Sequence, residues 1–150
     1  IYDEPVNRFV AGFIGTPPMN FIDCSLAHTD QGLALVHGAL CVPLPAAKAA
    51  AIGAKAPEHI VLGVRPEHIR LTQQPVAGSV PVEVFVTEPQ GHEVIVDLRF
   101  NDDILKVRGS TDTDLPFQLN LGDTVYMSVD PDKSYVFDGA TGERLDRSTS

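Results

Sequence analysis

Two glutamate–histidine doublets, Glu58-His59 and Glu67-His68, are the residues of this chain whose types and spacing come nearest to acid–base chemistry. A carboxylate beside an imidazole can tune that imidazole for proton transfer near neutral pH. A proline directly precedes each doublet, however, and the two doublets flank one short apolar run, which is typical of turns at the ends of a strand. The five histidines also lack the H-x-x-x-H spacing of a helical metal site. We therefore expect structural turns at both doublets.

Other motifs of catalysis and ligand binding do not occur in the sequence. It contains no G-x-x-x-x-G-K-[ST] phosphate loop, no G-x-G-x-x-G and no G-x-S-x-G nucleophile elbow. Residues 130–132 (Asp-Pro-Asp) begin like a calcium loop, but residues 133–135 break the ligand spacing, so we predict a turn there. The residues of this chain assemble no active site, and we expect it to have no catalytic residue, no metal and no cofactor of its own.

The charge balance argues against a nucleic-acid partner. The 150 residues carry 11 basic and 20 acidic side chains, a formal net charge of −9, while 43% of the residues are hydrophobic, as in a globular domain. Residues 76–150 hold 14 of the acidic side chains and only 6 of the basic ones. Affinity for nucleic acids depends mainly on lysine and arginine contacts to phosphates, so this half would repel DNA, RNA and anionic lipid.

Two cysteines, Cys24 and Cys41, are too few for a zinc site, and the sequence has no C-x-x-C. They could pair, but no secretory signal pattern marks the chain, and no apolar stretch approaches the ~20 residues of a membrane span. We therefore expect a cytosolic protein with two buried, reduced thiols.

The chain begins with a pattern that predicts a short helix. Pro5 suits a first helical turn, and apolar residues then recur at helical spacing until a Thr-Pro-Pro segment at 16–18 ends the helix. This abrupt start suggests that further residues precede Ile1. A second, weaker helical signal of one or two turns is the alanine-rich segment 46–56, which lacks large apolar anchors.

From residue 20 onward the apolar residues alternate with a period of two, which predicts β-strands. The clearest strand is 80–86, in which Val80, Val82, Val84 and Val86 share one face. Short strands separated by turn signals indicate a small barrel or sandwich, whose strand pairing stays open. The other expected strands are 20–28, 33–37, 40–44, 60–65, 94–100, 104–108, 125–129 and 134–137.

Four phrases of the sequence resemble a known family. IYDEPVNRFVAGFIGTPPMNF (1–21) resembles the junction after the nucleotide-binding domain in ATPase subunits of sugar-importing ABC transporters, the maltose and glycerol-3-phosphate importer type. LGVRPEHIRL (62–71) is similar to the G-[IV]-R-P-E-H motif of their C-terminal regulatory domains. VEVFVTEPQGHEVIVDLRF (82–100) and LGDTVYMSVDPDKSYVFDGATGERL (121–145) resemble parts of the transport-associated OB (TOBE) repeat.

The resemblance implies a mainly β fold, an OB-type (MOP-like) β-barrel with one short N-terminal helix. Residues 1–19 would be the junction helix and linker, and residues 20–150 the regulatory barrel. The ATPase core, with its ATP and magnesium, would lie upstream, so this chain would not be an enzyme. The parent subunit would be cytoplasmic and peripheral at the inner face of the cell membrane.

The resemblance also implies partners. We expect a homodimer whose regulatory domains stay in contact, and a junction helix that docks on the subunit's own nucleotide-binding domain through Phe9, Val10 and Phe13. Arg65, Glu67 and His68 are candidates for an interdomain or dimer contact, the alternative being that Arg65 and Glu67 only staple a turn. Transporter membrane subunits would be contacted indirectly, and a cytosolic regulator is a further candidate partner.

Three rival functions stay open at this point. The first is a free-standing barrel that senses a small ligand, an oxyanion or a sugar, held by backbone amides since basic side chains are few. The second is an OB module for oligonucleotides, which the charge and the absence of tryptophan oppose. The third is an autonomous enzyme, which no motif favours. The transported solute, the regulator and the dimer face cannot be inferred from the sequence.

Overall fold

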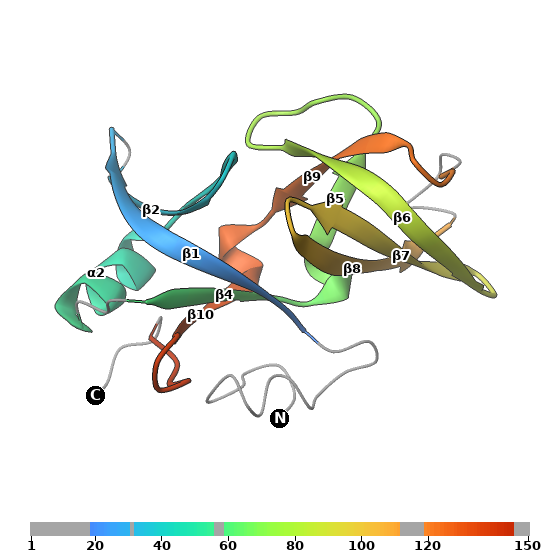
Figure 1. Cartoon of the computed structure of the whole chain (residues 1–150). Helices are drawn as coiled ribbons and strands as arrows, with labels where there is room; N and C mark the ends of the chain where they lie inside the picture. Colours follow the sequence, from blue (N-terminus) through green and yellow to red (C-terminus); the bar gives the residue numbers. More distant parts are fainter. Residues whose placement is uncertain (1–18, 31, 56–58, 112–118, 146–150) are drawn as a thin grey trace. The chain divides into compact units, whose positions relative to one another are not determined.

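A computed structural model of the chain describes residues 19–30, 32–55, 59–111 and 119–145 (Figure 1). The junction helix expected near the N-terminus, with Phe9, Val10 and Phe13, lies outside the described residues. Within the described ranges no helix has the length and apolar character needed to cross a bilayer. Most described residues lie in strands, so the prediction of a mainly β fold is confirmed. The strands are β1 (Asn20–Thr29), β2 (Gly32–His37), β3 (Leu40–Pro43), β4 (Ile60–Val64), β5 (Ile69–Thr72), β6 (Val80–Gln90), β7 (Glu93–Phe100), β8 (Asp103–Ser110), β9 (Thr124–Val129) and β10 (Ser134–Asp138).

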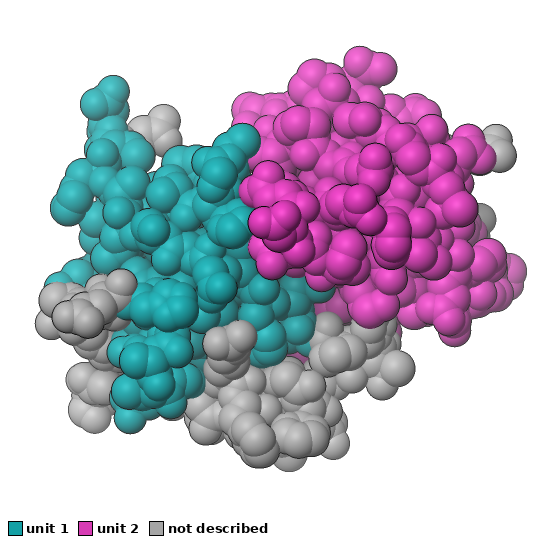
Figure 2. All heavy atoms as spheres, viewed as in Figure 1, with its two compact units in different colours: residues 1–64, 130–150 teal, residues 65–129 magenta. Residues whose placement is uncertain are grey.

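The chain forms two compact units, and the second is inserted into the sequence of the first (Figure 2). Unit 1 comprises residues 1–64 and 130–150, and unit 2 comprises residues 65–129. Each unit contains one five-stranded antiparallel sheet, in the order β10-β4-β1-β2-β3 in unit 1 and β5-β9-β6-β7-β8 in unit 2. Both sheets therefore join strands from distant parts of the sequence.

In unit 1 the long strand β1 pairs with two other strands. Its residues 20–24 pair with β4, and its residues 25–29 pair with β2. Helix α2 (Ala46–Lys55) contacts β2 and is anchored by Ile52, which is fully buried. This helix is longer than the one or two turns expected from the alanine-rich segment, because Ile52 supplies the apolar anchor that the composition appeared to lack.

The core of unit 1 is built around the ring of Phe137 on β10. Phe137 packs with Met19 and Val61, and Phe21 contacts it edge-on with ring centroids 6.0 Å apart. Gly63 on β4 lies directly under this ring: a methyl group at position 63 would lie 2.7 Å from Phe137 Cε2 and 2.7 Å from Met19 Sδ. The close packing of β10 on β4 therefore requires glycine at position 63.

Unit 2 has the alternating pattern that the sequence predicts, with one exception. Val80, Val82 and Val84 are buried, as are four of the five apolar residues of β7, all except Ile95. Val86 was expected on the same face but is exposed, because a β-bulge at Phe85 shifts the register between β6 and β7 and reverses the face. The predicted Asn101 turn is confirmed, and Asn101 adopts a left-handed φ of 55°.

The edges of the unit 2 sheet approach each other. Strand β8 at one edge contacts both β5 and the 3₁₀ turn η1 (Pro66–His68) at the other edge, so the sheet curls toward a barrel. Strand β5 was missed in the sequence, since its four residues follow the 3₁₀ turn directly and are too few to show a period.

The Gly63→Ala variant is expected to destabilise unit 1 by about 1–3 kcal/mol, because the added methyl overpacks a site held by Met19 and Phe137. Gly53→Ala is the matched control: its methyl would lie 3.8 Å from Leu33 Cδ1, and the helix interior should gain about 0.5–1 kcal/mol. Urea unfolding followed by circular dichroism measures both. Equal midpoints for wild type and Gly63→Ala would show that the contact does not constrain position 63.

The two cysteines are free thiols in different environments, which gives a second prediction. Cys24 is buried on β1, and burial, with a smaller contribution from the charge of Asp23, raises the pKa of its thiol to about 12. Cys41 on β3 is exposed, contrary to the expectation of two buried thiols. Only the thiolate reacts with iodoacetamide, and the raised pKa keeps the Cys24 thiol protonated at pH 8. We therefore expect one thiol per native chain, that of Cys41, to react rapidly, and two thiols per chain to react in urea.

The Cys41→Ser variant is the control for this labelling. It should leave no rapidly reacting thiol in the native chain while keeping one in urea. Rapid labelling of Cys24 in the folded variant would contradict the burial of that thiol.

Candidate functional site

Residues 65–68, the Arg-Pro-Glu-His segment, form a turn at the end of a strand, as the sequence predicted, and the turn leads into β5. Arg65 is extended, with φ −69° and ψ 146°, as expected for a residue before proline. Pro66 opens the 3₁₀ turn η1 and is buried, and the His68 backbone N–H donates to the Arg65 carbonyl at 2.9 Å. Arg65 itself is only 9% exposed. The segment is a partly buried turn that connects β4 to β5 along the chain.

The side chain of Glu67 extends from this turn to a neighbouring strand. Its Oε2 lies 3.7 Å from Arg108 Nη2 on β8, and Arg108 Nε lies 4.0 Å from Glu93 Oε2 at the start of β7. All three side chains are partly exposed, so each ion pair contributes at most about 1 kcal/mol. The contact supports the stapling interpretation of Glu67, with β8 as the element to which the turn is held.

Arg108 and Glu93 were not among the residues expected at this site. The structure brings them to Glu67 because β7 and β8 pair in a register that places Arg108 opposite Ile95. The only sequence signal for Arg108 and Glu93 was that polar residues alternate with apolar ones along two predicted strands. That signal does not identify the turn that these two side chains contact. His68 completes the group: its Nδ1 atom is buried and has no hydrogen-bond partner in the part of the chain that the structure describes.

The other doublet has a different environment in unit 1. Glu58 lies outside the described residues, whereas His59 precedes β4 and its Nε2 lies 3.3 Å from Asp23 Oδ1. The ring of His59 also lies against Gly139, whose N–H donates to the His59 carbonyl at 2.8 Å. His37 Nδ1 contacts the Asp23 carbonyl at 2.7 Å. These contacts join surface segments, and no group of three or more histidine, cysteine or acidic side chains in the described ranges is placed to hold a metal.

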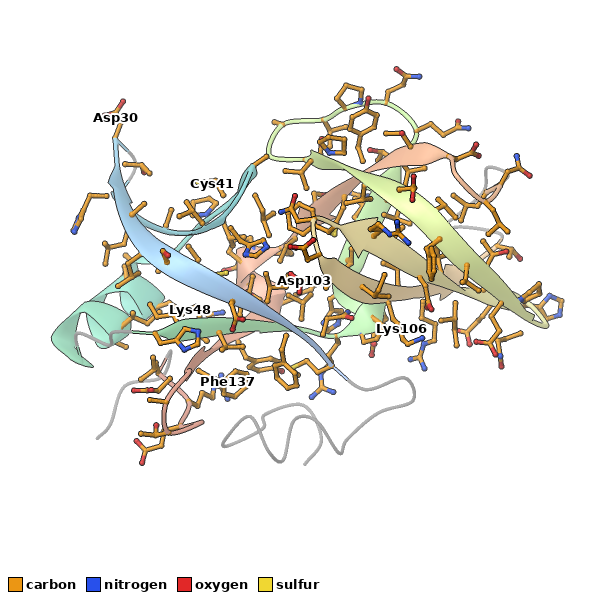
Figure 3. The ribbon with its side chains drawn as sticks, in the orientation of Figure 1. Asp30, Cys41, Lys48, Asp103, Lys106 and Phe137 are labelled. Carbon is orange, nitrogen blue, oxygen red and sulfur yellow. The ribbon has the colours of Figure 1, made fainter. Side chains whose placement is uncertain are left out.

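The segment 130–132 is a structural turn, as the sequence predicted. The Asp130 carboxylate accepts a hydrogen bond from the Asp132 backbone N–H at 2.9 Å. Lys48 on α2 donates to the carbonyls of Pro131 and Ser134, at 2.7 and 2.6 Å, and so ties the helix to the start of β10 (Figure 3).

Comparison with known proteins assigns this architecture to a family. Residues 15–69 match the MalK OB fold domain, and residues 62–137, half of the chain, match the TOBE domain. The chain is 34% identical over 147 residues to the sn-glycerol-3-phosphate import ATP-binding protein UgpC of Salmonella paratyphi A. It is 36% identical over 150 residues to the ABC transporter ATP-binding protein YurJ of Bacillus subtilis.

These matches cover a much larger share of this chain than of its relatives. They cover 97% of this chain but only 38% of UgpC and 40% of YurJ. Among solved structures, the cytoplasmic molybdate-binding protein ModG in its molybdate-bound form superposes with a TM-score of 0.63 at 11% identity, covering 78% of this chain and 94% of ModG. This likeness concerns the fold, and it agrees with the expected OB-type, MOP-like β architecture. The chain therefore belongs to the TOBE domain family and carries a MalK-type OB fold, as ATP-binding subunits of ABC importers do.

Proposed function

We propose that this chain is the regulatory and dimerisation domain of the ATP-binding subunit of an ABC importer for sugars or related small solutes. The observation that carries the proposal is the unequal coverage: almost the whole chain aligns with about two fifths of subunits named for ATP binding. What remains of those subunits is long enough for a separate ATPase core.

We assign ATP binding and hydrolysis to the part of the subunit that lies outside this chain. The sequence lacks a phosphate loop, and the two matched domains occupy residues 15–137 without a nucleotide-binding motif. We therefore place ATP and magnesium outside this chain, which by itself hydrolyses no ATP. The parent subunit would sit at the cytoplasmic face of the membrane and reach the membrane subunits through its ATPase domain.

Two segments are candidates for the contact with the ATPase domain. One is the junction helix with Phe9, Val10 and Phe13, outside the described residues, whose apolar face suits docking on another domain. The other is the turn at 65–68. Because Arg65 is buried, a partner would meet Glu67, whose side chain is 41% exposed, and His68.

Self-association gives the domain a mechanical role. Two regulatory domains that stay together keep their ATPase domains at a high effective concentration while these open and close, without any chemistry of their own. A cytosolic regulator bound to the same domain could then change the rate of transport by altering that contact.

The first test is the gene that encodes these residues. The reading frame upstream of Ile1 should contain a G-x-x-x-x-G-K-[ST] phosphate loop, as expected for an ATPase core joined to this domain. Sequencing the locus measures this directly. A native protein that begins near Ile1 would refute the link to an ATPase and would favour a free-standing barrel that senses an oxyanion or sugar.

A second prediction concerns association in solution. The purified 150-residue chain should self-associate weakly and reversibly, so its average mass in sedimentation equilibrium should rise from monomer toward dimer with concentration. A chain that stays monomeric at the highest soluble concentration would remove the dimerisation role while leaving the family assignment unchanged.

A further inference from the structure

The β-bulge in β6 gives unit 2 an unusual outer face. Val84 pairs with Leu98 and Val86 pairs with Asp97, so Phe85 is one extra residue inserted into β6. In a regular strand Phe85 and Val86 would point to opposite faces. Here both are exposed, 43% and 41%, because the extra residue turns Val86 outward beside Phe85. The bulge thus moves a valine from the core face to the solvent face.

The apolar surface extends from the bulge to neighbouring segments. Ile104 on β8, 46% exposed, pairs with Arg99, which in turn pairs with Glu83, so these three residues form a row across the outer face of the sheet. Leu121, 67% exposed, lies beside β6, since the next residue donates its N–H to the Val84 carbonyl at 2.8 Å. Four of the five large hydrophobic side chains exposed in the described residues therefore lie on or beside this face.

The charges on the same face are balanced and only partly paired. Lys106 bonds Asp97 at 2.9 Å. The guanidinium of Arg99 instead lies over the Phe85 ring, 4.7 Å from its centroid, although Glu83 is its direct partner across the strands. No ion pair within 4 Å joins Arg99 to Glu83 in the described residues, so both exposed side chains can contact a charged partner.

We propose that this surface, the bulge face, binds the bulge face of a second copy of the chain. It consists of Glu83, Phe85, Val86, Asp97, Arg99, Ile104, Lys106 and Leu121. The proposal rests on the self-association inferred above and names the surface responsible. In a two-fold dimer one patch meets itself, so it must be complementary to itself. The bulge face satisfies this condition, with two acidic and two basic side chains around an apolar centre.

Electrostatics selects this face over the rest of the chain for contact with another copy. Two copies each carry a net charge of −9 and repel each other, whereas the bulge face carries no net charge. Rotation by a two-fold axis can place Glu83 of one copy against Arg99 of the other, twice per dimer. The arginine is already held in place by Phe85, so this pairing costs little side-chain entropy.

Charge reversal tests the pairing. Glu83→Arg leaves two cations in the row of residues 83, 99 and 104, and Arg99→Glu leaves two anions there. Each variant alone should therefore dimerise at least about tenfold more weakly than wild type. An equimolar mixture of the two variants should associate as wild type does, because each copy then offers the charge that the other lacks. Sedimentation equilibrium of each variant and of the mixture measures this.

Two further variants separate this contact from general effects. Leu121→Ser should weaken association without any change of charge. Val76→Ser is the matched control, since Val76 is 47% exposed in the turn before β6 and lies outside the bulge face; its association should equal that of wild type. Circular dichroism should be unchanged in all four variants, because the substituted side chains are exposed.

The outcomes distinguish this inference from the function on which it rests. A monomeric wild-type chain would overturn both the self-association and the bulge face. If the wild type associates and the charge variants associate equally well, the self-association stands and the bulge face is overturned as its surface. Weakened single variants whose mixture is not restored would overturn the pairing of Glu83 with Arg99 across a two-fold axis.

Discussion

The packing of the Phe137 ring on Gly63 is the constraint on which unit 1 depends. The chain leaves this unit after Val64 and returns at Asp130, so the sheet is complete only when β10 finds its place on β4. The bare backbone of Gly63 lets the ring approach, and Met19 closes the same space from the N-terminal side. A contact between residues 74 positions apart in sequence thus joins the two segments of unit 1 that flank the inserted unit 2.

This constraint changes the interpretation of the sequence motif at 62–71. Gly63 is required by Phe137, Pro66 starts a 3₁₀ turn, and Arg65 is largely buried, so each has a structural reason to be present. Glu67 has a structural partner in Arg108 as well. Most of the motif therefore has a structural role at the point where the chain passes from unit 1 to unit 2. The fold does not account for His68, whose buried Nδ1 has no hydrogen-bond partner among the described residues.

The sequence predicted the strands well where burial on one face imposed a period of two, as in β7, whose alternate residues Val94, Val96, Leu98 and Phe100 are buried. It could not predict features that depend on pairing. The bulge at Phe85 leaves no mark in the alternation of valines, so Val86 was placed on the wrong face. Cys41 is exposed because it alternates with the buried Leu40 and Val42 on β3, whereas the contact of Arg108 with Glu67 follows from the curl of β8 toward η1. Local patterns carry no information about such neighbours.

The bulge leaves apolar surface exposed, a cost that accompanies the bend and twist it gives to the strand. Unit 2 has about 65 residues, a size at which a single core provides little stability in excess. Burying a valine side chain contributes about 1.5–3 kcal/mol, yet the bulge exposes Val86 beside an already exposed Phe85 and interrupts the ladder between β6 and β7. A regular strand of the same composition would retain that burial. A surface that covers the bulge face would recover that burial, and in so acidic a chain a charge-balanced apolar face would repel a second copy less than an acidic one.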